Sequence, residues 1–403
     1  MRARSFALLA VAFVAVAVAA ACGGNGGGGG STPTPTATTP PTSVTPCPRA
    51  PAAADRDRFA VVAHPYDAAG GQANAWEVLK LSSAGTLSRT GTTFTLGRAT
   101  FGEVAFTPDG KVGLVAQEDG SVGVFTLDAA GAVTVVTSAL TGAFYAGAIT
   151  MVPDGSRAIV VDGDTVPNGG GFYTIDIDCA GNVAAESSFT AARLPAAVEF
   201  LGDGAHAVAA AQSLLAMPAT DDAALLGWDG TSAPSLIASA NPFADDQQIV
   251  SAMAITSGGE FALIADDNQF SGNPNRIAAV RIGAATLTTA QMLSPFTDPA
   301  ALVASPFDQT ALVALAQGNA LHRLAYNGAT WSDSAVSVAG GAPQLPTVLT
   351  EIRRGTLAGH VLVAENVGVR QVHFSPGQTI TNDGLMTLGS GLTAITGALG
   401  VQP

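Results

Sequence analysis

The sequence predicts an all-β protein: a seven-bladed β-propeller of four-stranded antiparallel blades, in which the C-terminal strand closes the ring in the N-terminal blade. Two observations predict this fold. A hairpin of two strands around a small-residue turn recurs seven times, with turns 44 to 54 residues apart. A second pattern, two short apolar strands around a tight turn, precedes six of these hairpins. This period is typical of one propeller blade.

The seven hairpins are expected to form the two outer strands of each blade, because their strands alternate between apolar and polar residues. The copies cover residues 77–91, 123–136, 173–186, 225–238, 279–292, 321–334 and 372–385. Their turns are centred on Gly85, Gly131, Gly181, Gly230, Ala284, Gly328 and Gly377. Glycine suits such turns because it tolerates a positive φ without steric cost.

The second pattern is expected to form the two inner strands, because its runs of Val, Ala, Ile and Leu suit strands that neighbouring blades cover on both faces. The turns at 108–110 and 153–155 both read Pro-Asp-Gly, which supplies the backbone angles that a tight turn requires. The copies cover residues 104–117, 149–161, 198–210, 253–265, 302–315 and 348–364.

The first blade lacks an innermost strand at its own place in the chain. Residues 58–65 read as the second strand of a blade, and the matching first strand appears at residues 392–399. We therefore expect the C-terminal strand to complete the N-terminal blade. A ring closed in this way leaves no free strand edge.

The N-terminus carries an export signal. Arg2 and Arg4 precede an uncharged apolar run over residues 6–21, which is short for a membrane span. The run ends in three alanines followed by Cys22 and Gly23, which resembles the bacterial lipobox although Ala19 stands where that motif has Leu. The resemblance implies a lipoprotein signal peptide over residues 1–21 and lipid attachment at Cys22. The alternative is an ordinary secretory signal with an incidental cysteine.

The segment after the signal predicts a tether. Residues 22–54 are rich in Gly, Thr and Pro, cannot bury apolar surface and are expected to be disordered, whereas residues 55–403 form the propeller. The expected location is the cell envelope, outside the cytoplasm and anchored by lipid. In a diderm host, the lack of Asp after Cys22 resembles the pattern that is sorted to the outer membrane.

The two remaining cysteines predict a disulfide. Cys47 lies near the end of the tether and Cys179 lies in a hairpin turn. Unpaired thiols are unusual in exported proteins. A bridge would close a loop of roughly 130 residues, and closing so long a loop stabilises the folded state because it lowers the entropy of the unfolded chain. Two free thiols that never meet are the alternative.

Charge limits the partners. The chain has 17 basic and 31 acidic residues, a net charge of −14, and loss of Arg2 and Arg4 with the signal makes it more acidic. This excess excludes nucleic acid and the surface of an anionic membrane as partners. The lipid anchor is the expected link to the membrane, and a protein or a small molecule is the expected ligand.

The repeats resemble the seven-bladed propellers of the lactonase-like and surface-layer-like group. The turns at 108–110 and 153–155 and the hairpin at 128–134 carry the resemblance, which extends over residues 58–400. Members of this group include hydrolases that open sugar lactones, and some propellers of the group hold a metal ion in the central channel. The chain has no local motif that matches such a site, so the resemblance implies no catalytic residue here.

The histidines predict no metal site. No two of them share the His-x-x-x-His spacing of a local zinc motif, and we interpret them as scattered surface or hydrogen-bonded residues. They are His64, His206, His322, His360 and His373. The chain also lacks a Gly-x-Ser-x-Gly elbow and a phosphate-binding loop.

Two acidic loops are the best candidates for a metal ion such as calcium. They lie at residues 265–273 and 161–164, and together with Glu118 and Asp119 they could form one acidic face of the ring. Neither loop matches the twelve-residue calcium pattern, and we interpret both as solvated turns. We therefore expect no cofactor, with calcium as the alternative.

The remaining candidates lie in aromatic residues and long loops. Trp76, Trp228 and Trp331 lie on outer hairpin strands, where packing explains them as well as ligand stacking does. The segments 212–222 and 241–248 interrupt two blades, and such loops are where a rigid ring places binding residues.

The sequence therefore predicts a membrane-anchored binding or scaffold protein without enzymatic activity. The alternative is a lactonase-like hydrolase with a metal in the central channel. The lining of the channel should distinguish the two, because an enzyme needs carboxylates, His and Arg that converge within hydrogen-bonding reach.

Overall fold

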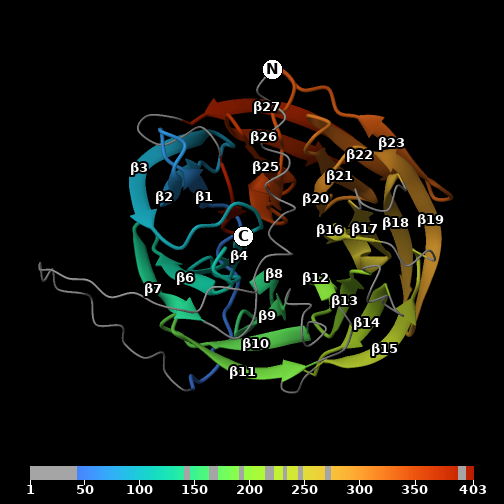
Figure 1. Ribbon diagram of the computed structural model, residues 1–403, viewed down its shortest axis with the longest axis horizontal. Helices are drawn as coiled ribbons and strands as arrows, with labels where there is room; N and C mark the ends of the chain where they lie inside the picture. The colour runs from blue at the N-terminus through green and yellow to red at the C-terminus, as the bar shows by residue number, and fades with distance from the viewer. Residues whose placement is uncertain are drawn as a thin grey trace, which may run out of the picture. The chain divides into compact units, whose positions relative to one another are not determined.

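A computed structural model describes residues 43–139, 146–162, 171–189, 195–213, 222–229, 234–243, 248–267, 274–388 and 396–403. These residues form seven four-stranded antiparallel sheets arranged as blades around a central axis (Figure 1). The helical segments among them are two short 3₁₀ turns, Ser257–Gly259 and Gly355–Leu357. The prediction of a seven-bladed all-β propeller is confirmed.

Blades 1 to 7 are numbered here by the order of their outer hairpins in the chain. From blade 1 to blade 7, the innermost strands are β28 (Leu399–Val401), β4 (Ala105–Phe106), β8 (Ala146–Met151), β12 (Pro195–Phe200), β16 (Val250–Ile255), β20 (Pro299–Ala304) and β24 (Val348–Glu351). In the same order, the second strands are β1 (Arg58–Tyr66), β5 (Val112–Ala116), β9 (Arg157–Asp162), β13 (His206–Ala211), β17 (Phe261–Asp266), β21 (Thr310–Leu315) and β25 (His360–Glu365).

The recurring hairpins provide the two outer strands of each blade, as predicted. The third strands are β2 (Gln72–Leu81), β6 (Val122–Leu127), β10 (Gly171–Ile177), β14 (Ala223–Gly227), β18 (Asn275–Gly283), β22 (Ala320–Tyr326) and β26 (Gly368–Ser375). The outermost strands are β3 (Leu87–Thr95), β7 (Val133–Ala139), β11 (Val183–Phe189), β15 (Ser235–Ala240), β19 (Thr286–Phe296), β23 (Trp331–Ala335) and β27 (Thr379–Thr387).

Burial follows the position of a strand in its blade. Every residue of β17 and β21 is buried, whereas β3 and β15 have no buried residue. The hydrophobic core of the described residues consists of seven clusters, each of which fills the space between two neighbouring blades. The core is therefore a set of layers around the ring, and it is complete only when the ring is closed.

The closing strand is β28, which pairs antiparallel with β1 in blade 1. Val401 lies opposite Ala60 and Leu399 lies opposite Val62, and both aliphatic side chains enter the core between blades 7 and 1. Closure by the C-terminal strand was predicted, although the expected strand at residues 392–399 lies too early in the sequence. Residues 392–395 lie outside the described part of the chain. The strand that pairs with β1 begins at Leu399, whose side chain is fully buried.

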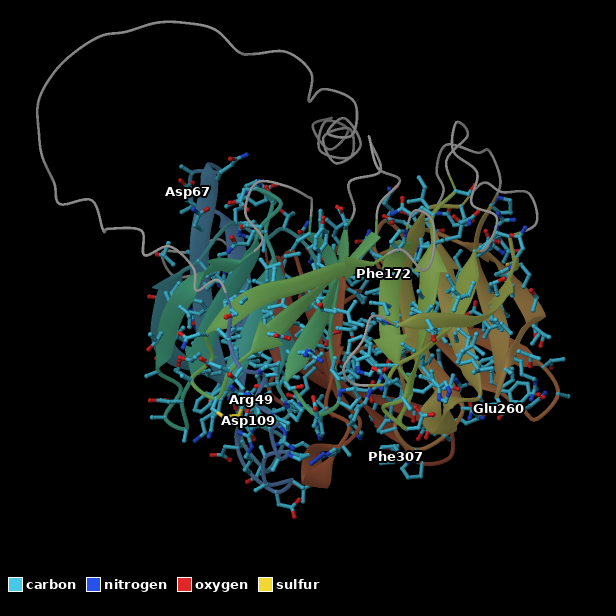
Figure 2. All side chains as sticks on the ribbon, turned by 90° about the horizontal axis from the view of Figure 1, so that it is seen from below. Arg49, Asp67, Asp109, Phe172, Glu260 and Phe307 are labelled. Atoms are coloured by element: carbon cyan, nitrogen blue, oxygen red, sulfur yellow. A yellow bond between two sulfur atoms is a disulfide. The ribbon has the colours of Figure 1, made fainter. Side chains whose placement is uncertain are left out.

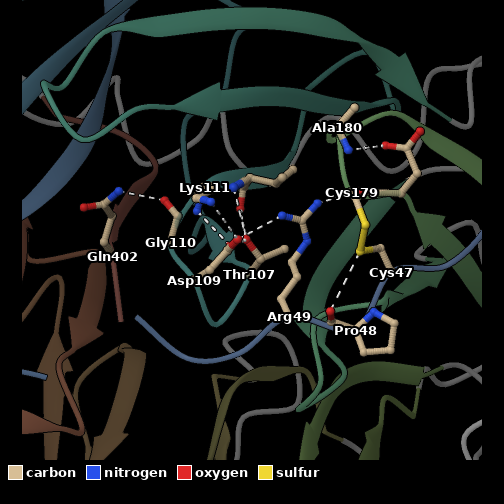
Figure 3. Close-up of polar contacts among 12 residues, drawn as sticks. Cys47, Pro48, Arg49, Thr107, Asp109, Gly110, Lys111, Cys179, Ala180 and Gln402 are labelled. Carbon is tan, nitrogen blue, oxygen red and sulfur yellow. Dashed lines mark hydrogen bonds and ion pairs between the residues drawn. A yellow bond between two sulfur atoms is a disulfide. The ribbon is translucent and has the colours of Figure 1, made fainter. Parts of the chain in front are cut away.

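An N-terminal strap, residues 47–57, lies along the face of the ring that carries the turns between first and second strands (Figures 2 and 3). Cys47 forms a disulfide with Cys179 in blade 3, with 5.1 Å between the two Cα atoms. The Arg49 Nη1 group donates to Asp109 Oδ2 of blade 2 at 3.0 Å, and a second Arg49 group donates to the carbonyl of Asp178. The cysteines that the sequence analysis paired are therefore bonded in the structure.

The strap continues to blades 1 and 7. The Arg56 guanidinium donates to Gln402 Oε1 at 2.9 Å, and the backbone N–H of Thr356 in blade 7 donates to Asp55 Oδ1 at 2.9 Å. Gly355 has φ of 79°, and a Cβ there would lie 2.1 Å from the carbonyl oxygen of Ala54, so this close approach requires glycine. Ordered chain therefore begins before residue 55, where the sequence analysis placed the boundary, because these contacts hold the end of the tether.

We expect deletion of residues 390–403 to destabilise the whole ring. The deletion removes β28 and the burial of Leu399 and Val401, which at about 2 kcal/mol for each side chain predicts a loss of at least about 4 kcal/mol in the free energy of unfolding. Thermal unfolding measured by circular dichroism checks this. Deletion of Pro403 alone, which lies beyond β28, is the control, and an equal Tm for the two truncations would contradict the role of the closing strand.

Candidate functional site

Three glutamates and one arginine converge on the central channel from blades that are far apart in the sequence. Glu103 lies two residues before β4, Glu199 lies on β12, Glu351 ends β24, and Arg353 follows two residues later. The innermost strands of blades 3, 5 and 6 carry no charged residue at all. The charged residues in blades 2, 4 and 7 therefore give the channel a local polar cluster, which we call the axial cluster.

The contacts of the axial cluster cross the ring. The Arg353 Nη2 group of blade 7 lies 3.0 Å from Glu199 Oε1 of blade 4. These blades are not neighbours, because blades 5 and 6 lie between them on the shorter route around the ring. The Arg353 Nε group lies 3.3 Å from Glu351 Oε2. Thr350 donates its hydroxyl to Glu103 Oε1 at 2.7 Å. Because Arg353 joins blades that are not neighbours, its side chain spans the channel.

Each glutamate occupies a distinct environment. Glu199 Oε2 also accepts the backbone N–H of Ile255 at 2.9 Å, so both of its oxygens have partners. Glu351 has a side chain that is 3% exposed, and its Oε1 atom has no hydrogen-bond partner. Glu103 is exposed to solvent, although groups of other blades, Thr350, Arg353 and Glu199, lie around its carboxyl group. Glu103 is therefore the carboxyl of the cluster best placed to meet a molecule in the channel.

Enclosure in the ring controls the charge of these groups. Burial raises the pKa of Glu103 to about 7, against the smaller opposing effects of the Thr350 hydrogen bond and of Arg353. Burial also raises the pKa of Glu351 to about 7, with Arg353 again opposing. The pKa of Glu199 is raised by the same cause, and Glu351 raises the pKa of Arg353 above its ordinary value. Two carboxyls of the axial cluster can therefore gain or lose a proton near neutral pH.

A cavity of about 350 Å³ adjoins the cluster on the strap-bearing face. Its wall comes from the turns between first and second strands of blades 4, 5 and 6, with Arg353 on the side of the channel. Asp203, Thr256, Ser257 and Ser305 supply polar groups to this wall. The volume and the mixed lining suit a small molecule with several hydroxyl or carbonyl groups.

The axial cluster does not fit the metal ion that the lactonase-like alternative places in the central channel. Calcium takes six to eight oxygen ligands, whereas Arg353 already lies between Glu199 and Glu351 and supplies the positive charge there. A group of three His, Cys, Asp or Glu side chains with mutually close ligand atoms does occur in the described residues, but it lies on blade 7.

Three of the five histidines lie in three different blades, and the other two lie together in blade 7. His64 is fully buried beside Glu77, with His64 Nε2 3.5 Å from Glu77 Oε2. His206 pairs with Asp203 at 2.6 Å and His322 pairs with Asp333 at 2.8 Å. His206 and His322 are hydrogen-bonded, as interpreted from the sequence, whereas His64 is a buried histidine beside a glutamate. His360 and His373, by contrast, lie side by side on blade 7 with ring centres 5.3 Å apart.

The acidic loops are tied into the fold where the structure describes them. Asp266 is buried, accepts the backbone N–H of Ile249 and pairs with Arg276 at 2.9 Å. Asp162 is buried at the equivalent end of β9, and Glu118 pairs with Arg98. Residues 163–164 and 268–273 lie outside the described part of the chain. The carboxylates of Asp162 and Asp266 are therefore buried and do not add to an open acidic face.

The tryptophans pack between strands, as the packing interpretation predicted. Trp76, Trp228 and Trp331 are at most 7% exposed, and Trp331 packs edge to face on Phe261 with ring centres 5.4 Å apart. Most of the loop at 212–222 and residues 244–247 of the second loop lie outside the described part. Gln248 and Asp222, at their ends, are fully buried and bonded to each other.

The signal peptide at 1–21, Cys22 and the tether up to residue 42 also lie outside the described residues. Among the described residues, the structure contains no helix with the length and apolar character that a membrane crossing requires.

Sequence reasoning missed the axial cluster. The only available signal was a comparison of the repeat copies, in which Glu199 and Glu351 are acidic residues on innermost strands and Glu103 lies just before one, whereas these strands are otherwise uncharged. That signal does not show that side chains from blades 2, 4 and 7 meet, because this depends on closure of the ring.

The chain is similar in structure to lactonase-like propellers. A periplasmic gluconolactonase of Pseudomonas aeruginosa is 15% identical with a TM-score of 0.60, and the match covers 86% of this chain and 99% of that one. A protein of Bacteroides fragilis described as a candidate 6-phosphogluconolactonase is 12% identical with a TM-score of 0.61, over 85% and 98% of the two chains. A Lactobacillus plantarum protein is 10% identical with a TM-score of 0.61, over 86% and 100%.

No protein-family model matches the chain, and no curated protein matches it in sequence. At these identities the structural neighbours establish the fold alone, which is the lactonase-like seven-bladed propeller that the sequence resembled.

We expect the stability of the protein to fall as pH rises from 5 to 8, in part because of Glu351. Its folded-state pKa of about 7 lies above the model-compound value of 4.5, so the contribution is intact below about pH 4.5 and is lost as pH rises through 7. Glu351→Gln should flatten this dependence by up to about 3 kcal/mol. Urea unfolding at several pH values checks it.

The control for this measurement is Glu260→Gln, which changes a partly exposed glutamate that pairs with Arg281 in blade 5 and is labelled in Figure 2. It should leave the slope of stability against pH unchanged. A slope in Glu351→Gln equal to that of the unmodified protein would show that Glu351 does not titrate as described.

Proposed function

We propose that this protein is a lipid-anchored binding protein of the bacterial cell envelope, and that its propeller takes a small, uncharged, polyhydroxylated ligand of the sugar-lactone class at the axial cluster. The observation that carries the proposal is the convergence of Glu103, Glu199, Glu351 and Arg353 beside a cavity of about 350 Å³. The lactonase-like neighbours support the class of ligand, because one of them is described as a gluconolactonase.

Charge favours an uncharged ligand over a phosphorylated one. Arg353 is the only basic residue in the described contacts of the axial cluster, and it already pairs with two carboxylates. A phosphate group would lie near at least one carboxylate whose negative charge no basic residue balances, and the two negative charges would repel each other strongly in an enclosed site. A hydroxyl group can instead donate to Glu103, and a hydroxyl or carbonyl oxygen can accept from Arg353, which agrees with the mixed lining of the cavity.

A second candidate function is hydrolysis of the same class of lactone without a metal. It is favoured by Glu103, because a carboxyl with a pKa of about 7 that water can reach has the protonation balance of a general base at neutral pH. Glu103 would accept a proton from water as the water oxygen attacks the lactone carbonyl. The bond from the carbonyl carbon to the ring oxygen would then break, and the ring oxygen would take the proton back from Glu103 to leave as a hydroxyl. The product is the open hydroxy acid.

We expect glucono-1,5-lactone to bind the purified chain in isothermal titration calorimetry more tightly than gluconate does, because the acid adds a negative charge to the axial cluster. Glu103→Gln keeps the shape of the side chain and removes its charge, and Arg353→Ala removes the ligand's main donor. Arg353→Ala should weaken binding at least about tenfold. Glu260→Gln, outside the channel, should bind as the unmodified protein does.

The same samples separate the two candidates. Acid release measured at constant pH should stay at the spontaneous rate if the protein only binds the lactone. A rate above that background, lost in Glu103→Gln while binding persists, would replace the binding function with hydrolysis. Absence of binding to the lactone and to a panel of neutral sugars would contradict both.

We expect Cys22→Ser to release the protein from the membrane. The thiol of Cys22 is the proposed attachment point, and acyl chains stabilise membrane binding by about 0.8 kcal/mol for each buried CH₂ group. Fractionation of a bacterial host expressing the chain checks this: the unmodified protein should sediment with membranes and Cys22→Ser should stay in the soluble or secreted fraction. Equal membrane association of the two would contradict the anchor, and Cys47→Ser serves as the cysteine control.

A further inference from the structure

Three ligand-type side chains meet on blade 7, away from the axial cluster. His360 lies on β25, His373 on β26 and Asp383 on β27, so three adjacent strands each contribute one residue. The ligand atoms of the three side chains lie within 4.8 Å of one another. The proposed ligand function of the channel uses none of these residues.

Strand pairing explains why the three side chains converge. His360 and His373 are direct partners across β25 and β26, so their side chains leave the same face of the sheet. In the next ladder, Gln371 pairs with Gly384 and Val372 pairs with Asn382, which leaves Asp383 as the extra residue of a β-bulge. A bulge redirects a side chain, and here the carboxylate of Asp383 is turned towards the two imidazoles.

The distances are close to those of a bound ion. His373 Nδ1 lies 2.8 Å from each oxygen of Asp383, and His360 Nδ1 lies 3.6 Å from Asp383 Oδ2. Ligands at about 2.0 to 2.2 Å from a tetrahedral zinc ion lie about 3.3 to 3.6 Å apart. Adjustments of about an ångström in side-chain positions would therefore suffice.

Neighbouring groups support the orientation of the rings. Thr381 Oγ1 lies 3.0 Å from His373 Nε2, so it can accept a hydrogen bond from the Nε2–H group, and in this tautomer Nδ1 has the lone pair that binds an ion. Gln371 Nε2 contacts His360 Nδ1 at 2.9 Å and also donates to the carbonyl of Gly85, so an ion at Nδ1 must displace the first of these contacts.

The three side chains are partly exposed, by 17% for His360, 30% for His373 and 26% for Asp383. An ion could therefore enter from solvent and complete its coordination with water. We propose that His360, His373 and Asp383 form a binding site for one divalent transition-metal ion of the zinc class. Imidazole with a single carboxylate suits such an ion, whereas calcium and magnesium require more oxygen ligands than this site offers.

Blade 6 supplies a matched control. There His322 Nδ1 contacts Asp333 at 2.8 Å, with the pair on adjacent strands β22 and β23. This is the same histidine–carboxylate contact, but it belongs to no group of three ligands among the described residues. If a single His–Asp pair were enough for binding, both blades would take up an ion.

Calorimetric titration of tag-free, metal-stripped protein with Zn²⁺ tests the site, with Co²⁺ absorption in the visible region as a report on its ligands. We expect one ion per chain, an increase in Tm on addition of Zn²⁺, and no response to Ca²⁺. His373→Ala and the isosteric Asp383→Asn should each weaken Zn²⁺ binding by about 100-fold and abolish the increase in Tm. His322→Ala should change neither.

Circular dichroism of each variant without metal shows whether the ring is intact, and Asp383→Asn provides a test that needs no loss of side-chain volume. Absence of Zn²⁺ binding, or equal affinity in Asp383→Asn and the unmodified protein, would overturn the proposal. So would equal weakening in His322→Ala. Because none of these residues contacts the axial cluster, failure here would leave the proposed ligand function intact.

Discussion

Closure of the ring by β28 is the interaction on which the rest of the structure depends. The hydrophobic core lies between blades rather than within one compact centre, so an open ring would expose the faces of blades 1 and 7. β28 covers this position with Leu399 and Val401. The strap adds a second tie, since it is bonded covalently to blade 3 at Cys179 and reaches blade 7 at Thr356.

Closure also creates the axial cluster. The backbone of Glu103 in blade 2 forms a β-bridge with Leu399 of blade 1, and its carboxylate accepts a hydrogen bond from the Thr350 hydroxyl of blade 7. Arg353 then spans the channel to Glu199. The same arrangement that brings these groups together surrounds the carboxyls of Glu103 and Glu351 with protein atoms from several blades, which raises their pKa values. Proximity and altered acidity thus have one physical cause.

The group on blade 7 arises differently. It depends on the register within one sheet, where His360 faces His373 and a bulge turns Asp383 towards them. It would persist in any ring in which this blade is folded. The axial cluster, in contrast, requires the positions of blades 2, 4 and 7 relative to one another. The two sites can therefore be separated by mutation, because neither shares a residue with the other.

The sequence by itself determined the number of blades, their strands and the partner of the first blade, because hairpin alternation, turn residues and period are local properties. It also indicated the pairing of Cys47 with Cys179. Only the tertiary structure decided which polar side chains meet. Arg353 and Glu199 are separated by 154 residues, and His373 and Asp383 meet through a bulge that no spacing rule reveals. Such contacts depend on ring geometry and strand register, which local sequence patterns do not encode.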